Sequence, residues 1–208
     1  MGFKEKNIID DTLKLCKTNQ SLKGSIKNSK LGQKVYTTTP NIEHSSCNSE
    51  VDVVISKKRS FEAAKKYRKS KVGVLNFASF TNPGGGVLNG SIAQEECLCR
   101  CSTLFPCLDK LRGSYYDRHR FLLETNKLDY FYNDDCIYTP DVVVFKQDTE
   151  NASLERENFW YTVDVISCAA PNLRRLADNK RAVLDDNKLL ELYTNRIRRI
   201  FAIAKENV

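Results

Sequence analysis

The sequence lacks any apolar run long enough to cross a membrane, and no apolar signal segment follows its first residues. A membrane-spanning helix needs about 20 consecutive apolar residues, and no run in this chain of 208 residues approaches that length. The first six residues read Met-Gly-Phe-Lys-Glu-Lys, and no hydrophobic stretch of the secretory type comes after them. We therefore expect no membrane association and a location in the cytosol or nucleus.

Histidine is nearly absent, with two in the chain, and none of the eight cysteines forms a Cys-x-x-Cys pair. Cys97, Cys99 and Cys101 alternate along the sequence. Alternate residues of a helix point about 200° apart, so these three thiolates cannot converge on one ion. We expect no metal site, and without a secretory signal the cysteines should be reduced and mostly buried.

The chain also lacks internal repeats, a clear interdomain linker and a recognised nucleic-acid-binding motif. Its apolar content of 41% is sufficient for a packed core, and one main domain is expected at this length. The net charge of +7 comes from scattered lysines and arginines, which can attract a polyanion weakly. Direct nucleic-acid binding is therefore not expected.

Alternating strand and helix patterns predict an α/β fold. The expected strands cover residues 51–55, 72–77, 137–138, 142–145 and 161–168, and the expected helices cover 8–16, 60–69, 91–105 and 189–204. Such alternation is typical of a three-layer α/β/α arrangement around a mixed, mostly parallel sheet. Residues 1–50 are expected to form an N-terminal extension, with one short helix and a flexible stretch over 19–34, and 51–208 the main domain.

The last predicted helix has an apolar face that we expect to be buried. This face contains Leu189, Leu190, Tyr193, Ile197, Ile200, Phe201 and Ala204. Arg196, Arg198 and Arg199 lie mostly off it.

A glycine-rich loop follows the predicted strand 72–77 and leads into two adjacent carboxylates. It reads Gly84-Gly85-Gly86, then seven residues, then Gln94-Glu95-Glu96. Ligands of such sheets bind at the C-terminal ends of strands. Backbone N–H groups of a glycine loop can surround a phosphate, and the carboxylates one helical turn away can serve as acid or base. This combination indicates an enzyme that cuts a bond in a nucleotide-sugar.

Two simpler interpretations of these residues remain open. Glu96 and Arg100 are four positions apart and could form an ordinary surface ion pair on a helix. The glycines could form a tight turn with no ligand. The sequence Ser91-x-x-Gln94 fits a capping box, which would place Ser91 at the start of the helix.

At these residues the chain resembles the microbial-type poly(ADP-ribose) glycohydrolases, a branch of the macrodomain superfamily. The resemblance rests on the glycine triplet with Gln94-Glu95-Glu96 and on the flanking segments 75–79, 82–83 and 98–100. Segments 138–142 and 170–172 add to it, and it extends over roughly residues 50–208. It implies a macrodomain-like fold that hydrolyses poly(ADP-ribose) or acts on other ADP-ribosylated macromolecules without a cofactor.

The resemblance also implies roles for individual residues. Glu96 would be the catalytic acid at the ribose–ribose bond, and Glu95 would hold ribose hydroxyls. The ligand-binding residues would be Gly84, Gly85, Gly86 and Val87 through their amides, together with Gln94, Asn76, Ser79 and Asn82.

The resemblance further implies a strand and a second ligand loop after the helix 189–204, whereas this sequence ends at Val208. We therefore expect a C-terminally shortened domain. Three explanations stay open: an incomplete product, closure by a strand from residues 1–50 or from a second subunit, or a degenerate member. A non-catalytic ADP-ribose-binding macrodomain is the alternative function.

Overall fold

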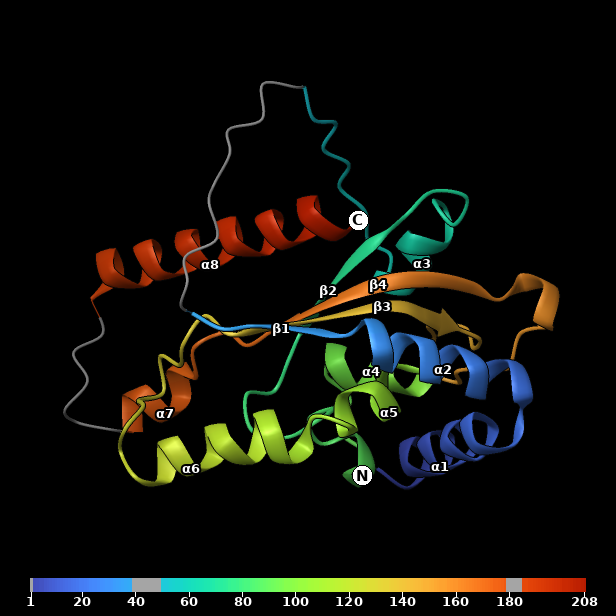
Figure 1. The fold of residues 1–208 in the computed structure, drawn as a ribbon, viewed down its shortest axis with the longest axis horizontal. Coiled ribbons are helices and arrows are strands. Elements are labelled where there is room, and N and C mark those ends of the chain that lie inside the picture. Colours follow the sequence, from blue (N-terminus) through green and yellow to red (C-terminus); the bar gives the residue numbers. More distant parts are fainter. Residues whose placement is uncertain (1, 39–49, 179–184) are drawn as a thin grey trace.

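A computed structural model describes residues 2–38, 50–178 and 185–208 (Figure 1). Its α-helices are α1 (Phe3–Thr18), α2 (Gln20–Gly32), α3 (Ser60–Lys65), α4 (Gln94–Cys101), α5 (Leu104–Asp109), α6 (Arg118–Glu124), α7 (Leu173–Asp178) and α8 (Asp186–Asn207). Short turns of other helix types are η1 (Val87–Asn89), η2 (Arg112–Asp117) and η3 (Glu157–Phe159). Within the described residues, no helix combines the length and the apolarity needed to cross a bilayer.

The sheet is mixed and has the order β1-β3-β4-β2. Its strands are β1 (Lys34–Tyr36), β2 (Gly73–Phe77), β3 (Cys136–Val144) and β4 (Tyr161–Cys168). Strand β2 runs parallel to β4, whereas β1–β3 and β3–β4 are antiparallel. The α/β class is confirmed, but the expectation of a mostly parallel sheet is wrong. The reason is that residues 145–160 return the chain from β3 to β4 without a crossover helix.

Helices cover both faces of the sheet (Figure 1). Helix α8 packs on one face, where Ile203 meets a cluster from the strands that consists of Cys136, Tyr138, Ile166 and Cys168. The other face carries the larger core, in which Val74, Ile137 and Val165 pack with Leu98, Leu104 and Ile9 of α4, α5 and α1. The three-layer arrangement is therefore present, and it leaves the C-terminal end of β2 beside the N-terminal end of α4.

Residues 3–36 pack into this core and are not a separate extension. Helix α1 buries Ile9, Thr12 and Cys16 at helical spacing, and β1 pairs with β3. The predicted flexible stretch 19–34 is wrong, because it contains α2, whose first turn is capped by the side chain of Asn19. The rest of the predicted extension, residues 39–49, lies outside the described residues. Strand β1 does add to the sheet from this region, at the edge opposite β2.

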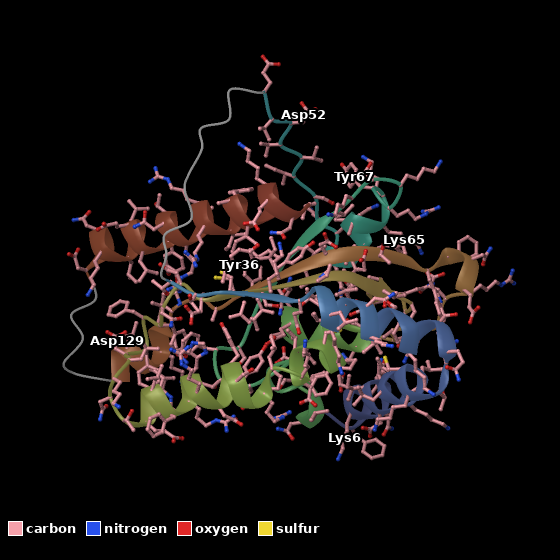
Figure 2. The ribbon with its side chains drawn as sticks, in the orientation of Figure 1. Lys6, Tyr36, Asp52, Lys65, Tyr67 and Asp129 are labelled. Carbon is pink, nitrogen blue, oxygen red and sulfur yellow. The ribbon has the colours of Figure 1, made fainter. Side chains whose placement is uncertain are left out.

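Residues 51–55 do not form the predicted strand. Val51, Val53, Val54 and Ile55 are all exposed, and no strand includes them. Figure 2 shows Asp52 of this segment away from the sheet. The apolar pattern predicted a strand, but no strand among the described residues pairs with this segment.

Two helix predictions also need correction. The predicted helix 91–105 is split into α4 and α5, and α4 begins at Gln94 with Ala93 as its N-cap, not Ser91. Ser91 cannot form the capping box because the Gln94 side chain bonds to β2 instead. In α8, Leu190, Ile197 and Phe201 of the expected buried face are exposed, whereas Arg196 and Arg199 are buried.

Candidate active site

Glu96 is one of two adjacent buried carboxylates at the start of α4. Its side chain is turned back to the glycine loop, where Oε1 accepts a hydrogen bond of 2.8 Å from the backbone N–H of Gly86. Oε2 is buried and has no hydrogen-bond partner among the described residues. A buried polar atom without a partner is uncommon in folded proteins and calls for an explanation. A ligand hydroxyl or ether oxygen that approaches Oε2 would supply the partner.

Glu95, the neighbouring carboxylate, accepts hydrogen bonds on both oxygens. Its Oε1 accepts a hydrogen bond from Asn76 Nδ2 (3.1 Å), and its Oε2 accepts one from the backbone N–H of Ser79 (2.7 Å). Burial raises the pKa of Glu95 to about 7, and the nearby charge of Glu96 adds to the rise. The hydrogen bonds from Ser79, Asn76 and the Gly84 backbone lower the pKa and partly offset these effects. Glu95 can therefore hold or release a proton near neutral pH.

Asn76 and Ser167 form the support beneath Glu95. Asn76 is fully buried in β2, and its Nδ2 donates both to Glu95 and to Ser167 Oγ (3.0 Å). Both protons of the amide are therefore used inside the protein. Its Oδ1 is buried without a partner among the described residues, and the expected ribose contact of Asn76 stays a prediction. The position of Asn76 suits the orientation of Glu95.

The glycine loop lacks side chains where it passes closest to the carboxylates. Gly85 has a φ of +59°, and a Cβ atom there would collide with Oε1 of Glu96. Gly84 has a φ of +68°, and a Cβ atom there would lie 2.7 Å from the ring of Phe105. Only glycine meets both the conformational and the steric demand at these two positions.

Three of the four loop amides expected to bind diphosphate are already engaged inside the protein. The Gly86 N–H donates to Glu96 Oε1 (2.8 Å), the Gly85 N–H donates to Asn82 O (3.0 Å), and the Val87 N–H donates to Gly84 O (3.1 Å). The Gly84 backbone lies near Glu95 and lowers the pKa of that carboxyl group. In this conformation the loop positions the carboxylates, and the amides of residues 85–87 could reach a diphosphate only after exchanging partners.

Gln94 is part of the same helix turn but is bonded to the edge of the sheet. Its Oε1 accepts from the Phe77 N–H (2.9 Å), and its Nε2 donates to Leu75 O (2.8 Å) and to Ser60 Oγ (3.1 Å). These backbone groups of β2 face away from β4, so the Gln94 amide completes the edge of the sheet as a neighbouring strand would. The amide of Gln94 is thus engaged within the protein, and the ligand contact expected from Gln94 stays a prediction.

Comparison with known proteins decides the family. The chain matches the family described as "Microbial-type PARG, catalytic domain" over residues 5–147. The chain belongs to this microbial-type PARG family. The match begins within α1, so residues before 50 are part of the family region, which the sequence resemblance had placed at 50–208.

Solved PARG structures have the same fold. The chain has a TM-score of 0.79 and 24% identity to the poly(ADP-ribose) glycohydrolase of Thermomonospora curvata, covering 97% of this chain and 75% of that chain. Against the enzyme of Deinococcus radiodurans in complex with ADP-ribose the TM-score is 0.69 at 26% identity, covering 86% of this chain and 70% of that chain. A comparison with curated proteins finds no match.

Within this PARG-family domain, the structure brings together Glu95, Glu96, the glycine loop and Ser79. Asn82 lies at the margin, where it is exposed and its Oδ1 accepts a hydrogen bond of 3.2 Å from Arg120. Arg120 also binds Thr81 O (2.9 Å) and so holds the segment that enters the loop. The sequence carried no signal for Arg120, because it lies 38 residues from Asn82 in a helix without a motif.

Arg100 is the other residue that sequence reasoning misread. It does not pair with Glu96: its Nη1 donates to Ser91 O (2.6 Å) and its Nη2 contacts Cys97 Sγ (3.2 Å). The side chain is buried, so the interpretation of a surface ion pair is wrong. Arg100 instead links α4 to Ser91, which follows the glycine loop.

Proposed function

We propose that this chain is a poly(ADP-ribose) glycohydrolase in which Glu96 is the general acid. The observation that supports the proposal is the buried Oε2 of Glu96, which has no partner among the described residues while Gly86 fixes Oε1. An acid held by one oxygen presents the other in a defined direction. Family membership supplies the substrate class, a polymer of ADP-ribose.

The proposed reaction breaks the ribose–ribose O-glycosidic bond. Glu96 protonates the departing ribose oxygen, the anomeric carbon becomes oxocarbenium-like, and water attacks it to release ADP-ribose. Glu95 lies beside this carboxyl group and binds ribose hydroxyls, held in place by Asn76 and Ser79. Diphosphate binding by residues 84–87 requires the amides of residues 85–87 to leave their present acceptors.

The experiment that tests the proposal is release of ADP-ribose from purified poly(ADP-ribose), measured by chromatography together with binding of ADP-ribose by calorimetry. We expect release by the 208-residue chain and its loss in Glu96→Gln, with ADP-ribose affinity retained. Equal release by the variant and the parent would contradict the role of Glu96.

A second candidate is a domain that binds ADP-ribose without hydrolysis. One observation favours it: the amides of residues 85–87 are engaged inside the protein, so in this conformation the loop does not clamp a diphosphate where turnover requires it. Binding of ADP-ribose by a folded sample that releases none from the polymer would select this candidate. Absence of both binding and release would reject both functions.

A further inference from the structure

Cys136 and Cys168 face each other across two antiparallel strands. Cys136 is the first residue of β3, Cys168 is the last of β4, and the two are direct partners in the ladder. Both belong to the cluster under α8. All the cysteines that the structure describes, these two included, are free thiols.

The hydrogen-bond pattern of β4 defines the geometry of this pair. The carbonyl of Cys168 accepts from the Ala78 N–H (3.1 Å), so the backbone groups of Cys168 point to the β2 side and away from β3. Cys136 and Cys168 are therefore a non-hydrogen-bonded pair of the β3–β4 ladder. In such pairs the Cα atoms lie about 4.5 Å apart and the side chains are closest. A disulfide needs a Cα separation of roughly 4.4–6.8 Å, so the strands already have a suitable spacing.

The surroundings make Cys168 the more reactive of the two thiols. The adjacent Cys136 thiol lowers the pKa of Cys168, and the positive charges of Arg196 and Arg199 lower it further, against the effects of burial and of the Asp134 charge. The same thiol contact and burial raise the pKa of Cys136. Thiolate character increases attack on an oxidant.

A small oxidant has a route to Cys168. A cavity of about 120 Å³ lies between the ends of β2 and β4 and helix α8. Cys168 lines it together with Phe77, Ala169 and Ile197. Phe77 and Ile197 are about half or more exposed, so the cavity adjoins the surface.

We propose that Cys136 and Cys168 are a modification site, where a peroxide converts the two thiols into a reversible cross-strand disulfide. The Cys168 thiolate attacks one peroxide oxygen, the O–O bond breaks, and the leaving hydroxide takes up a proton to become water. Cys136 then attacks the sulfur of the resulting sulfenic acid, the S–S bond forms, and a second water leaves. Two thiols and one hydrogen peroxide thus give one disulfide and two waters, with no dependence on the proposed hydrolysis.

This disulfide would form close to the residues that hold Glu95 in the candidate active site. Ala78, which is bonded to the Cys168 carbonyl, precedes Ser79, whose N–H holds Glu95. A disulfide between Cys136 and Cys168 would join β3 to β4 beside Ala78 and Ser79. In reducing compartments disulfides are usually transient, so the site would respond to oxidant and reverse with thiol.

The test is treatment of the folded chain with dilute hydrogen peroxide, followed by alkylation of remaining thiols and peptide mapping without reductant. We expect a peptide that links Cys136 to Cys168, its loss after dithiothreitol, and a melting temperature higher by roughly 5 °C in the oxidised form. Recovery of both cysteines as alkylated thiols, or linkage of either to another cysteine, would overturn the proposal. This result is obtained on the parent chain and does not depend on whether a variant folds.

Matched variants identify the attacking thiol. In Cys136→Ala, a 1,3-dione reagent should trap the sulfenic acid on Cys168, whereas in Cys168→Ala it should leave Cys136 unlabelled. Cys107→Ala, which alters a buried cysteine of a different cluster, should form the disulfide as the parent does. Trapping on Cys136 in place of Cys168 would contradict the assigned order of attack.

Discussion

The backbone N–H of Gly86 holds Oε1 of Glu96 at 2.8 Å, and the other oxygen of that carboxylate has no partner among the described residues. Because Oε1 is held by this hydrogen bond, the unsatisfied Oε2 points in a defined direction. Glu95, by contrast, accepts bonds on both oxygens. The two neighbouring carboxylates are therefore suited to different tasks, and the predictions below separate them.

Replacing Glu96 with Gln should lower kcat for ADP-ribose release by about 10²- to 10⁴-fold, the usual contribution of a general acid. The amide keeps an acceptor for Gly86, so we expect binding of ADP-ribose to change by only a few-fold. Initial rates on poly(ADP-ribose) and calorimetric titration check these values. Glu150→Gln, at an exposed residue remote from the site, should behave as the parent.

Replacing Gly85 with Ala should damage the site, because the new Cβ collides with Glu96 at a positive φ. We expect a loss of about 1–2 kcal/mol in the free energy of unfolding, and a fall in kcat larger than the change in KM. Denaturant unfolding and kinetics on the polymer measure both. Gly24→Ala is the matched control, since it lies in α2 with no atom within 4 Å of the added Cβ.

The control should gain about 0.5–1 kcal/mol, because alanine is the better helix former. If Gly85→Ala retained full activity and stability, the close approach of the loop to Glu96 would be irrelevant to function.

The raised pKa of Glu95 predicts that the free energy of unfolding depends on pH. Its pKa rises from the ordinary glutamate value of 4.5 to about 7 in the folded chain, so folding favours the protonated form. This contribution to stability is complete below about pH 4.5 and is lost as the pH rises to about 7. The loss amounts to roughly 3 kcal/mol, taking about 1.4 kcal/mol for each unit.

Glu95→Gln tests this effect, because Gln cannot ionise. Between pH 4.5 and 8, the free energy of unfolding of the parent should therefore fall by roughly 3 kcal/mol relative to that of the variant. Urea titrations at several pH values measure it, and a difference that does not vary with pH would contradict the assignment.

Local patterns in the sequence were sufficient to predict strands β2 and β4 and the position of the glycine loop. Strand β4 has the predicted bounds, and the apolar run before the glycines is β2. The motif of glycines and adjacent carboxylates also predicted that Glu96 would meet the loop, because both follow the end of one strand. These features depend on neighbours in sequence.

Features that depend on distant partners could not be predicted. The break expected at 139–141 is a β-bulge inside one strand, in which Asp141 takes a φ of +52° and the ladder continues. Strand β1 has three residues, too few for a periodic pattern. The engagement of Gln94 with β2 depends on the angle between α4 and the sheet, which no spacing in the sequence encodes.

The burial of Arg196 supplies the last prediction and explains the error about α8. Its guanidinium donates to Asp134 Oδ1 (2.8 Å) and to backbone carbonyls at Ala169, Phe131 and Asn133. Arg196→Ala would leave these acceptors unpaired, so we expect a loss of about 3–5 kcal/mol in the free energy of unfolding. Arg198→Ala, two positions along the same helix and exposed, should change it by less than about 0.5 kcal/mol. Denaturant titration of the two variants checks the contrast. Equal effects would contradict the burial and hydrogen bonding of Arg196.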